Sequence, residues 1–505
     1  MPELRPCFLA SAALLASASC GLAQTAIEWA SAVDGDFGVP TNWSPAFVPG
    51  VLDTAVLGRS GPYVVSTDGG ELASVEMPNA EATLGLDSGR TLVLTGAPGP
   101  GDPRTVSGTG TLVVNREAAA GGATLILHRG TVMTGVIRLN GFDVDAASLR
   151  TDGDGPPPVL AGVVSGRGQL QDDFALTGSL DATGAGDVLR VDRATIVLSP
   201  TAIVRANAGG AILLTQTTMQ GGVFDGGNGG GLDANGGAIA DAEFLNRWIM
   251  PHGARLQLQG LVDGGGTIVV NDRPGGQRTS LELAQAATIE VAVVLNGPED
   301  SSDARLVGPA SGAPPVMLGE VTGAGQLVGR LELAGRLAPS AGDGSPDSSI
   351  GTLVPRSADH TITATARTEI DVAGTADDAF DRIAGQGTIR LGGTLAVAFA
   401  DGFAPAPGDR FEIVSATSIE GTFDAVDLGS VGSAGPAHLV YAGDSVTVVA
   451  CAADRDGDGE LTIFDFLGFQ NQFDAGDAQA DLDRDGLLTI FDFLAFQNRF
   501  DAGCG

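Results

Sequence analysis

The chain has 505 residues, of which 61 are acidic and 27 basic, so its formal net charge is −34. A chain this acidic lacks the basic surface that nucleic acids and anionic membranes require of a partner. All 27 basic residues are arginine, which excludes Schiff-base chemistry and a lysine-dependent phosphate loop.

Residues 1–23 have the pattern of a secretory signal peptide: Arg5, an apolar run over residues 8–16, and a cleavage site at Gly21-Leu-Ala23. Cys20 offers an alternative lipoprotein site, although the usual leucine before such a cysteine is missing. The run is too short to span a membrane. We therefore expect a secreted or cell-surface protein whose mature chain has no transmembrane segment.

The body, residues 24–449, is expected to consist of β-strands. Short runs of Val, Leu and Ile, such as 91–94, 123–127 and 445–449, end at Gly, Asp or Pro. No ten-residue stretch has a convincing helical period. The glycine-rich segment Asp225–Gly237 is expected to be a loop.

A Gly-x-Gly signature recurs along the body. Its second glycines are residues 110, 168, 266, 325 and 387, which gives steps of 58, 98, 59 and 62 residues. A tight glycine turn before each strand suits a chain that winds in stacked coils around a narrow interior. The sequence therefore predicts an elongated β-solenoid, similar to a parallel β-helix.

The two ends of the body have signatures of their own. Trp29, Phe37 and Asn42-Trp43-Ser44 resemble the opening of secreted proteins built from autotransporter-like β-strand repeats, and residues 379–449 resemble the closing segment of that class. The resemblance implies that the tryptophans cover the open end of the coil. The class has no shared chemistry.

No catalytic residue is predicted in the body. The adjacent pairs Asp172-Asp173 and Asp377-Asp378 would point to opposite faces of a strand. The four histidines have no metal-ligand spacing and are expected at the surface or in loops: His128, His252, His360 and His438. A polysaccharide hydrolase or lyase, which would use a pair of carboxylates, is the alternative.

Two acidic loops, 27 residues apart, occupy residues 454–465 and 481–492. Each has carboxylates at positions 1, 3, 5 and 12 and a glycine at position 6, which is the spacing of a calcium loop with a backbone carbonyl ligand at position 7. We expect two Ca²⁺ ions. The first would be bound by Asp454, Asp456, Asp458, the Glu460 carbonyl and Asp465, and the second by Asp481, Asp483, Asp485, the Leu487 carbonyl and Asp492.

Each loop is followed by a helix. The segments directly before the loops are too short to form an entering helix of their own. This doubled arrangement over residues 450–505 resembles a dockerin domain of the GC type. The resemblance implies a calcium-dependent module that binds a cohesin-like domain or a cell-surface scaffold. The contacts would be Ile463, Phe464, Ile490 and Phe491. Dockerins often carry a basic residue late in each helix. The corresponding positions here hold Gln472 in the first copy and Arg499 in the second.

Two further expectations concern this module. Once the signal is removed, Cys451 and Cys504 bracket it, and an exported chain would join them in a disulfide worth about 4 kcal/mol. The helices are apolar on nearly every face, so either a partner or the neighbouring β-strands must cover them. The leading prediction is an exported, non-catalytic structural or surface-attached protein. The alternative is a polysaccharide-degrading enzyme that joins a complex through its dockerin.

Overall fold

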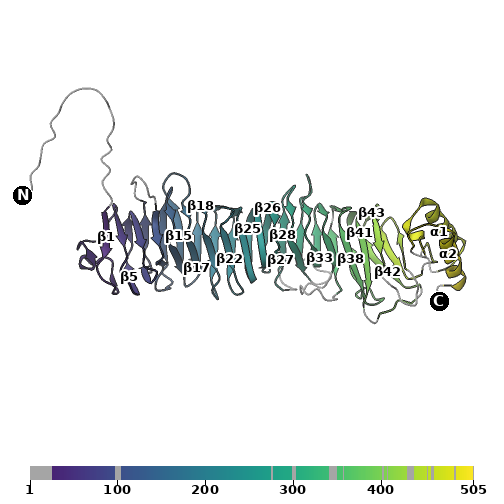
Figure 1. Cartoon of the computed structure of the whole chain (residues 1–505), viewed down its shortest axis with the longest axis horizontal. Helices are drawn as coiled ribbons and strands as arrows, with labels where there is room; N and C mark the ends of the chain where they lie inside the picture. The colour runs from purple at the N-terminus through teal and green to yellow at the C-terminus, as the bar shows by residue number, and fades with distance from the viewer. Residues whose placement is uncertain are drawn as a thin grey trace, which may run out of the picture.

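The computed structural model describes residues 25–96, 104–273, 277–297, 303–339, 350–356, 358–400, 403–406, 408–428, 437–451, 453–456, 460–482 and 485–503. The signal-peptide prediction lies outside these residues. The described chain is mainly β, with two helices at its C-terminal end, as predicted. Figure 1 shows an elongated body with these helices at one tip.

Parallel strand pairing builds the body. Through much of its length, the partner of a strand lies three strands further along the chain. One such series comprises β5 (Tyr63–Thr67), β8 (Ala82–Leu86), β11 (Thr111–Val114), β14 (Val136–Asn140), β17 (Val163–Gln171) and β20 (Val188–Asp192). Each strand of the series therefore lies beside the previous strand of the same series, and the body extends along one axis.

The core is a set of stacked aliphatic side chains. In register, Leu84 pairs with Leu112, Leu112 with Ile137, and Ile137 with Val164, and all four are fully buried. Burial alternates along a strand, as in β12 (Ala123–His128), because successive side chains point to opposite faces. The core needs few aromatic residues because equivalent inward positions stack on one another.

The Gly-x-Gly signature at Gly166 and Gly168 marks a place where one strand bends from one series to the next. β17 pairs with β14 up to Arg167 and with β15 (Ala147–Asp152) from Gln169 onward. At the bend, Gly166 has a φ of +99°, and a Cβ there would lie 2.2 Å from the Leu139 carbonyl oxygen. Only glycine fits this conformation and this close approach without strain.

Antiparallel pairs occur at both ends of the described body. At the N-terminal end, β1 (Thr25–Trp29) pairs with β3 (Trp43–Ser44), and the buried rings of Trp29 and Trp43 meet edge to face at 5.0 Å. At the other end, β46 (Ser445–Val449) pairs with β42 (Arg410–Ser415) and β45 (His438–Tyr441). These pairs interrupt the parallel stack at its two ends.

Two expectations about the body are wrong. Asp225–Gly237 is not a loop but part of β25 (Val223–Met250). Its glycines permit close stacking, since a Cβ at Gly230 would lie 2.5 Å from the Ala206 carbonyl oxygen. His360 and His438 are buried rather than exposed. His360 stacks in register between Leu331 and Ile389, an inward position that the sequence pattern does not reveal.

The helices are α1 (Ile463–Ala475) and α2 (Ile490–Ala502). None of the helices in the described residues is long and apolar enough to cross a membrane. We call residues 450–505 the C-terminal unit, residues 454–465 loop 1 and residues 481–492 loop 2.

Candidate metal centre

The same capping arrangement starts both helices. Thr462 is the N-cap of α1, and its hydroxyl accepts a hydrogen bond from the Phe464 amide at 3.1 Å. Asp465, at the third helical position, accepts one from the Thr462 amide at 2.7 Å. Thr489 and Asp492 repeat this capping box in α2. The last carboxylate of each loop is therefore also the residue that fixes the start of the helix.

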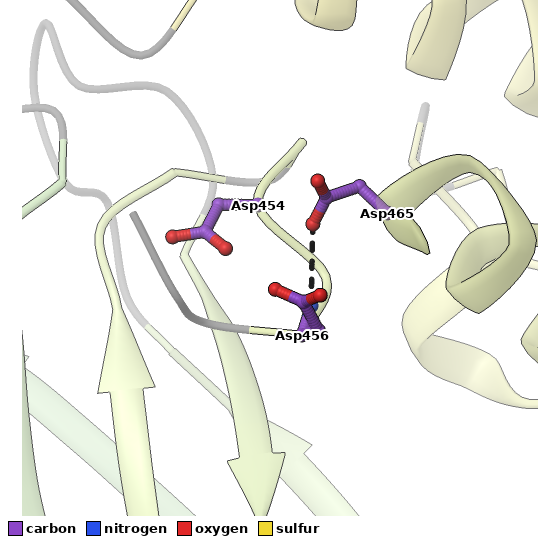
Figure 2. A group of neighbouring side chains, drawn as sticks. All are labelled: Asp454, Asp456 and Asp465. Carbon is purple, nitrogen blue, oxygen red and sulfur yellow. Dashed lines mark hydrogen bonds between the residues drawn. The ribbon is translucent and has the colours of Figure 1, made fainter. Parts of the chain in front are cut away.

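Three of the predicted ligands in loop 1 converge. Asp454, Asp456 and Asp465 each offer a carboxylate oxygen, and these atoms all lie within 4.8 Å of one another. Asp454 and Asp465 are fully buried, and Asp456 is exposed. Figure 2 shows the three side chains around one small space. Carboxylates this close repel one another in their charged form, and an oxygen-only donor set suits a hard cation such as Ca²⁺.

Backbone amides hold the Asp465 carboxylate in place. Its Oδ1 accepts hydrogen bonds from the amides of Arg455 at 2.6 Å and Asp456 at 3.3 Å, the second of which is dashed in Figure 2. Its Oδ2 accepts the Thr462 amide described above. These donors come from both ends of loop 1, so Asp465 closes the loop on itself.

Loop 2 repeats these contacts. Asp492 is fully buried, and it accepts hydrogen bonds from the amides of Leu482 at 2.7 Å and Thr489 at 2.8 Å. Asp481 accepts one from the Gly486 amide at 2.8 Å. Its other oxygen is buried and has no hydrogen-bond partner in the part of the chain that the structure describes. Both loops thus use their last carboxylate in the same way.

Some predicted ligands lie where the structure gives no test. Asp458 and Asp483 are outside the described residues, as is Cys504, so the pairing of Cys504 with the buried Cys451 stays a prediction. Glu460 and Leu487 are exposed at position 7 of their loops. Their carbonyls stay predicted ligands.

An aromatic core joins the two helices. Phe469 of α1 stacks on Phe496 of α2, and pairs related by the 27-residue repeat have similar geometry. The ring centroids of Phe469 and Phe473 are 5.9 Å apart, and those of Phe496 and Phe500 are 5.8 Å apart. The helices therefore pack as two nearly equivalent halves.

The predicted partner contacts lie on the surface. Ile463 and Ile490 are each 62% exposed, and Phe464 and Phe491 are each 64% exposed. The neighbouring strands therefore do not cover these four side chains. Leu467 and Leu494 are also exposed and were missed. Helical spacing could have revealed them, since each lies four residues after an exposed isoleucine.

The C-terminal unit contacts the end of the body through loop 1 and the segment before loop 2. The Gln479 side chain accepts a hydrogen bond from the Leu439 amide of β45 at 3.1 Å. The Arg455 guanidinium donates to the Gln479 carbonyl at 2.9 Å and lies 5.5 Å from the Phe469 ring centroid. Burial lowers the pKa of Arg455 to about 10. The absence of a linker before Cys451 predicts that this unit docks against the body, but sequence reasoning did not identify the contacting residues, which lie 24 and 40 residues apart in the chain.

The adjacent pair Asp377-Asp378 lies on the body, at a groove of about 370 Å³ that Arg356 and Arg382 also line. Arg382 is 3.8 Å from Asp377, whose side chain is 91% exposed. The pair Asp172-Asp173 forms ion pairs with Arg150 at 3.9 Å and Arg129 at 3.7 Å. These contacts give Asp172 and Asp173 a structural use.

No protein-family model and no curated protein matches the sequence.

Proposed function

We propose that the C-terminal unit is a calcium-dependent, dockerin-like attachment module and that the body is a β-solenoid rod that carries it. The protein would then be an exported, non-catalytic structural or surface-attached protein. The observation that carries the proposal is the convergence of Asp454, Asp456 and Asp465 in a loop whose ligand spacing the chain repeats 27 residues later. The parallel series of strands supports the solenoid.

Each loop would hold one Ca²⁺. In loop 1 the carboxylates of Asp454, Asp456 and Asp465 fit such an ion, and in loop 2 Asp481 and Asp492 occupy the corresponding positions. A bound cation would offset the repulsion between the carboxylates. Because Asp465 and Asp492 also cap the helices, each ion would be coupled to the folding of its helix.

The exposed apolar side chains support a protein partner. Ile463 and Phe464 start α1, Ile490 and Phe491 start α2, and all four leave large apolar area in water although the helices share a closed core. Exposed apolar surface of this kind marks interaction sites. The partner would be a cohesin-like domain or a cell-surface scaffold.

A calcium titration of the full-length protein, followed by calorimetry, tests the metal proposal. Two binding events are expected, and one should be lost in Asp465→Asn. The partner proposal is tested with purified cohesin domains and the double variant Phe464→Ala, Phe491→Ala. Phe142→Ala is the matched control, because Phe142 is 65% exposed on the body. Absence of calcium binding would refute the proposal of a calcium-dependent module. Equal cohesin binding by all variants would refute the assignment of Phe464 and Phe491 as contact residues.

The groove at Asp377 and Asp378 favours a second candidate, a polysaccharide-degrading enzyme held in a complex by the same module. It brings two carboxylates and two arginines to one site on the body. Release of reducing or unsaturated ends from polysaccharides, lost in Asp377→Asn with Asp378→Asn, would support it. If the protein cleaves none of the polysaccharides tested, the enzyme candidate is rejected and the non-catalytic structural role stands.

A further inference from the structure

Three arginines lie on strands of one stack near this groove: Arg305 on β31 (Ala304–Val307), Arg356 on β36 (Thr352–Arg356) and Arg382 on β39 (Arg382–Ala384). β33 (Val321–Val328) lies between β31 and β36, since Arg305 pairs with Gln326 and Arg356 with Val328. Arg382 pairs with Thr352. Arg356 and Arg382 therefore line the groove together with Asp377 and Asp378, and Arg305 lies on a strand of the same stack outside the groove lining.

These guanidinium groups are poorly compensated. Among the described residues, Arg305 and Arg356 have no ion-pair partner, whereas Arg382 has Asp377 at 3.8 Å and Glu412 at 4.0 Å. The Nε atom of each of the three is buried and has no hydrogen-bond partner in the described part of the chain. A buried donor without an acceptor is costly, so these positions suit a ligand that supplies acceptors.

The electrostatic surroundings agree with this geometry. Burial lowers the pKa of Arg305, and the positive charges of Arg278 and Arg356 lower it further, while Glu282 acts in the opposite direction. Among the described residues, the carboxylates near the site are Glu282 beside Arg305, Asp377 and Asp378 in the groove, and Glu412 at 4.0 Å from Arg382. An arriving anion would relieve the repulsion between the arginines.

We propose that this groove binds an acidic polysaccharide. Arg356 and Arg382 would contact a carboxylate or sulfate group, for which a guanidinium fork has matching geometry. The Thr352 hydroxyl and the carboxylates of Asp377 and Asp378 would meet sugar hydroxyls along the same groove. The stack continues on both sides of the groove, where β33 pairs with β36 and β42 pairs with β39, so an extended chain would lie across several strands.

Because the net charge of the chain is −34, the groove favours an anion of low charge density over one of high charge density. Double-stranded DNA carries about one charge per 1.7 Å, so most of its phosphates would face acidic surface. A polysaccharide with one carboxylate per disaccharide places neutral sugar between its charges. Only its anionic groups would then need the arginines.

Binding of hyaluronan to the immobilised full-length protein tests the proposal, with neutral dextran, duplex DNA and free glucuronate as comparison ligands. Measurements in calcium and in EDTA exclude calcium bridges between uronates and the acidic protein. The wild type should bind hyaluronan in both buffers and more tightly than it binds the other three. The variant Arg356→Ala with Arg382→Ala should bind it at least about tenfold more weakly, as expected for lost charged hydrogen bonds.

The matched control is Arg90→Ala with Arg150→Ala, which removes the same charge from two half-exposed arginines elsewhere on the body. It should bind like the wild type, and circular dichroism should show all three proteins folded. Equal weakening in both double variants would reduce the effect to net charge and overturn the proposal. So would tighter binding of dextran or DNA, or equal affinity for free glucuronate and hyaluronan. The test does not depend on calcium binding or on cleavage, so it can fail independently of the proposed attachment function.

Discussion

The rings of Phe469 and Phe496 lie face to face, with centroids 4.4 Å apart and planes 4° from parallel. The two residues are related by the 27-residue repeat and are both fully buried. Their stack therefore lies where the two halves of the C-terminal unit meet. The core around it contains Val449, from the last strand of the body, so the helices and the body share buried surface.

Phe469→Ala and Phe496→Ala should each destabilise the helical unit by about 3–5 kcal/mol, the usual cost of truncating a buried phenylalanine. The near symmetry predicts similar losses in the two variants. Thermal melts followed by the helical circular dichroism signal measure them. Phe464→Ala is the control and should change the melt little, because Phe464 is largely exposed.

Calcium should stabilise the helices, and Asp465→Asn or Asp492→Asn should remove much of that effect. At a calcium concentration 100 times the Kd, one bound ion adds about 2.7 kcal/mol. The helical melt should therefore shift with calcium in the wild type and much less in the variants. Asp474→Asn and Asp501→Asn are matched controls, since these exposed helix carboxylates lie outside the loops and are related by the same repeat. A wild-type melt that does not respond to calcium would contradict the metal sites.

Removing the exposed aromatic pair should leave stability intact and change surface behaviour. Phe464→Ala with Phe491→Ala removes apolar groups that are mostly in water, so the free energy of unfolding should change by less than about 1 kcal/mol. Binding of a hydrophobic dye such as ANS to the folded protein should fall. An unchanged dye signal would indicate that these side chains do not form an accessible apolar surface.

Asp381 should make the body less stable as the pH rises. It is buried, and it accepts hydrogen bonds from the amides of Gly351 at 2.8 Å and Asp371 at 3.1 Å. Burial raises the pKa of Asp381 to about 7. The folded state therefore keeps a proton that the unfolded chain releases near pH 4. This contribution to stability is present below pH 4 and is lost as the pH rises to 7.

Denaturant unfolding at pH 4, 5.5 and 7 measures this dependence. The loss between pH 4 and 7 has an upper limit of about 4 kcal/mol, since one pKa unit corresponds to about 1.4 kcal/mol, and it should be absent in Asp381→Asn. His360 and His438 act in the opposite direction, because burial lowers their pKa values to about 4 and about 3. The folded protein therefore loses stability through these two groups as the pH falls below 6.5. Their effect cancels when the variant is compared with the wild type. Asp377→Asn, at an exposed site, should keep the wild-type slope.

The sequence by itself determined the β character of the body, the positions of the two helices and the repeat that relates them. These features depend on local patterns: apolar runs closed by glycine or proline, Thr462 and Thr489 as N-caps, and carboxylates at fixed spacing. Such patterns act over a few residues, so they are visible in one dimension. The same local view failed for Asp225–Gly237, where glycines serve strand stacking rather than a loop.

Only the tertiary structure decided which distant groups meet. It buried His360 and His438, brought Gln479 against Leu439, left Phe464 and Phe491 in water, and set Arg305 near Arg356. Each outcome depends on which residues become neighbours when strands or helices separated by tens of residues stack. Local spacing carries no record of that stacking, because the free energy of burial is determined by contacts that form only once the whole chain has packed.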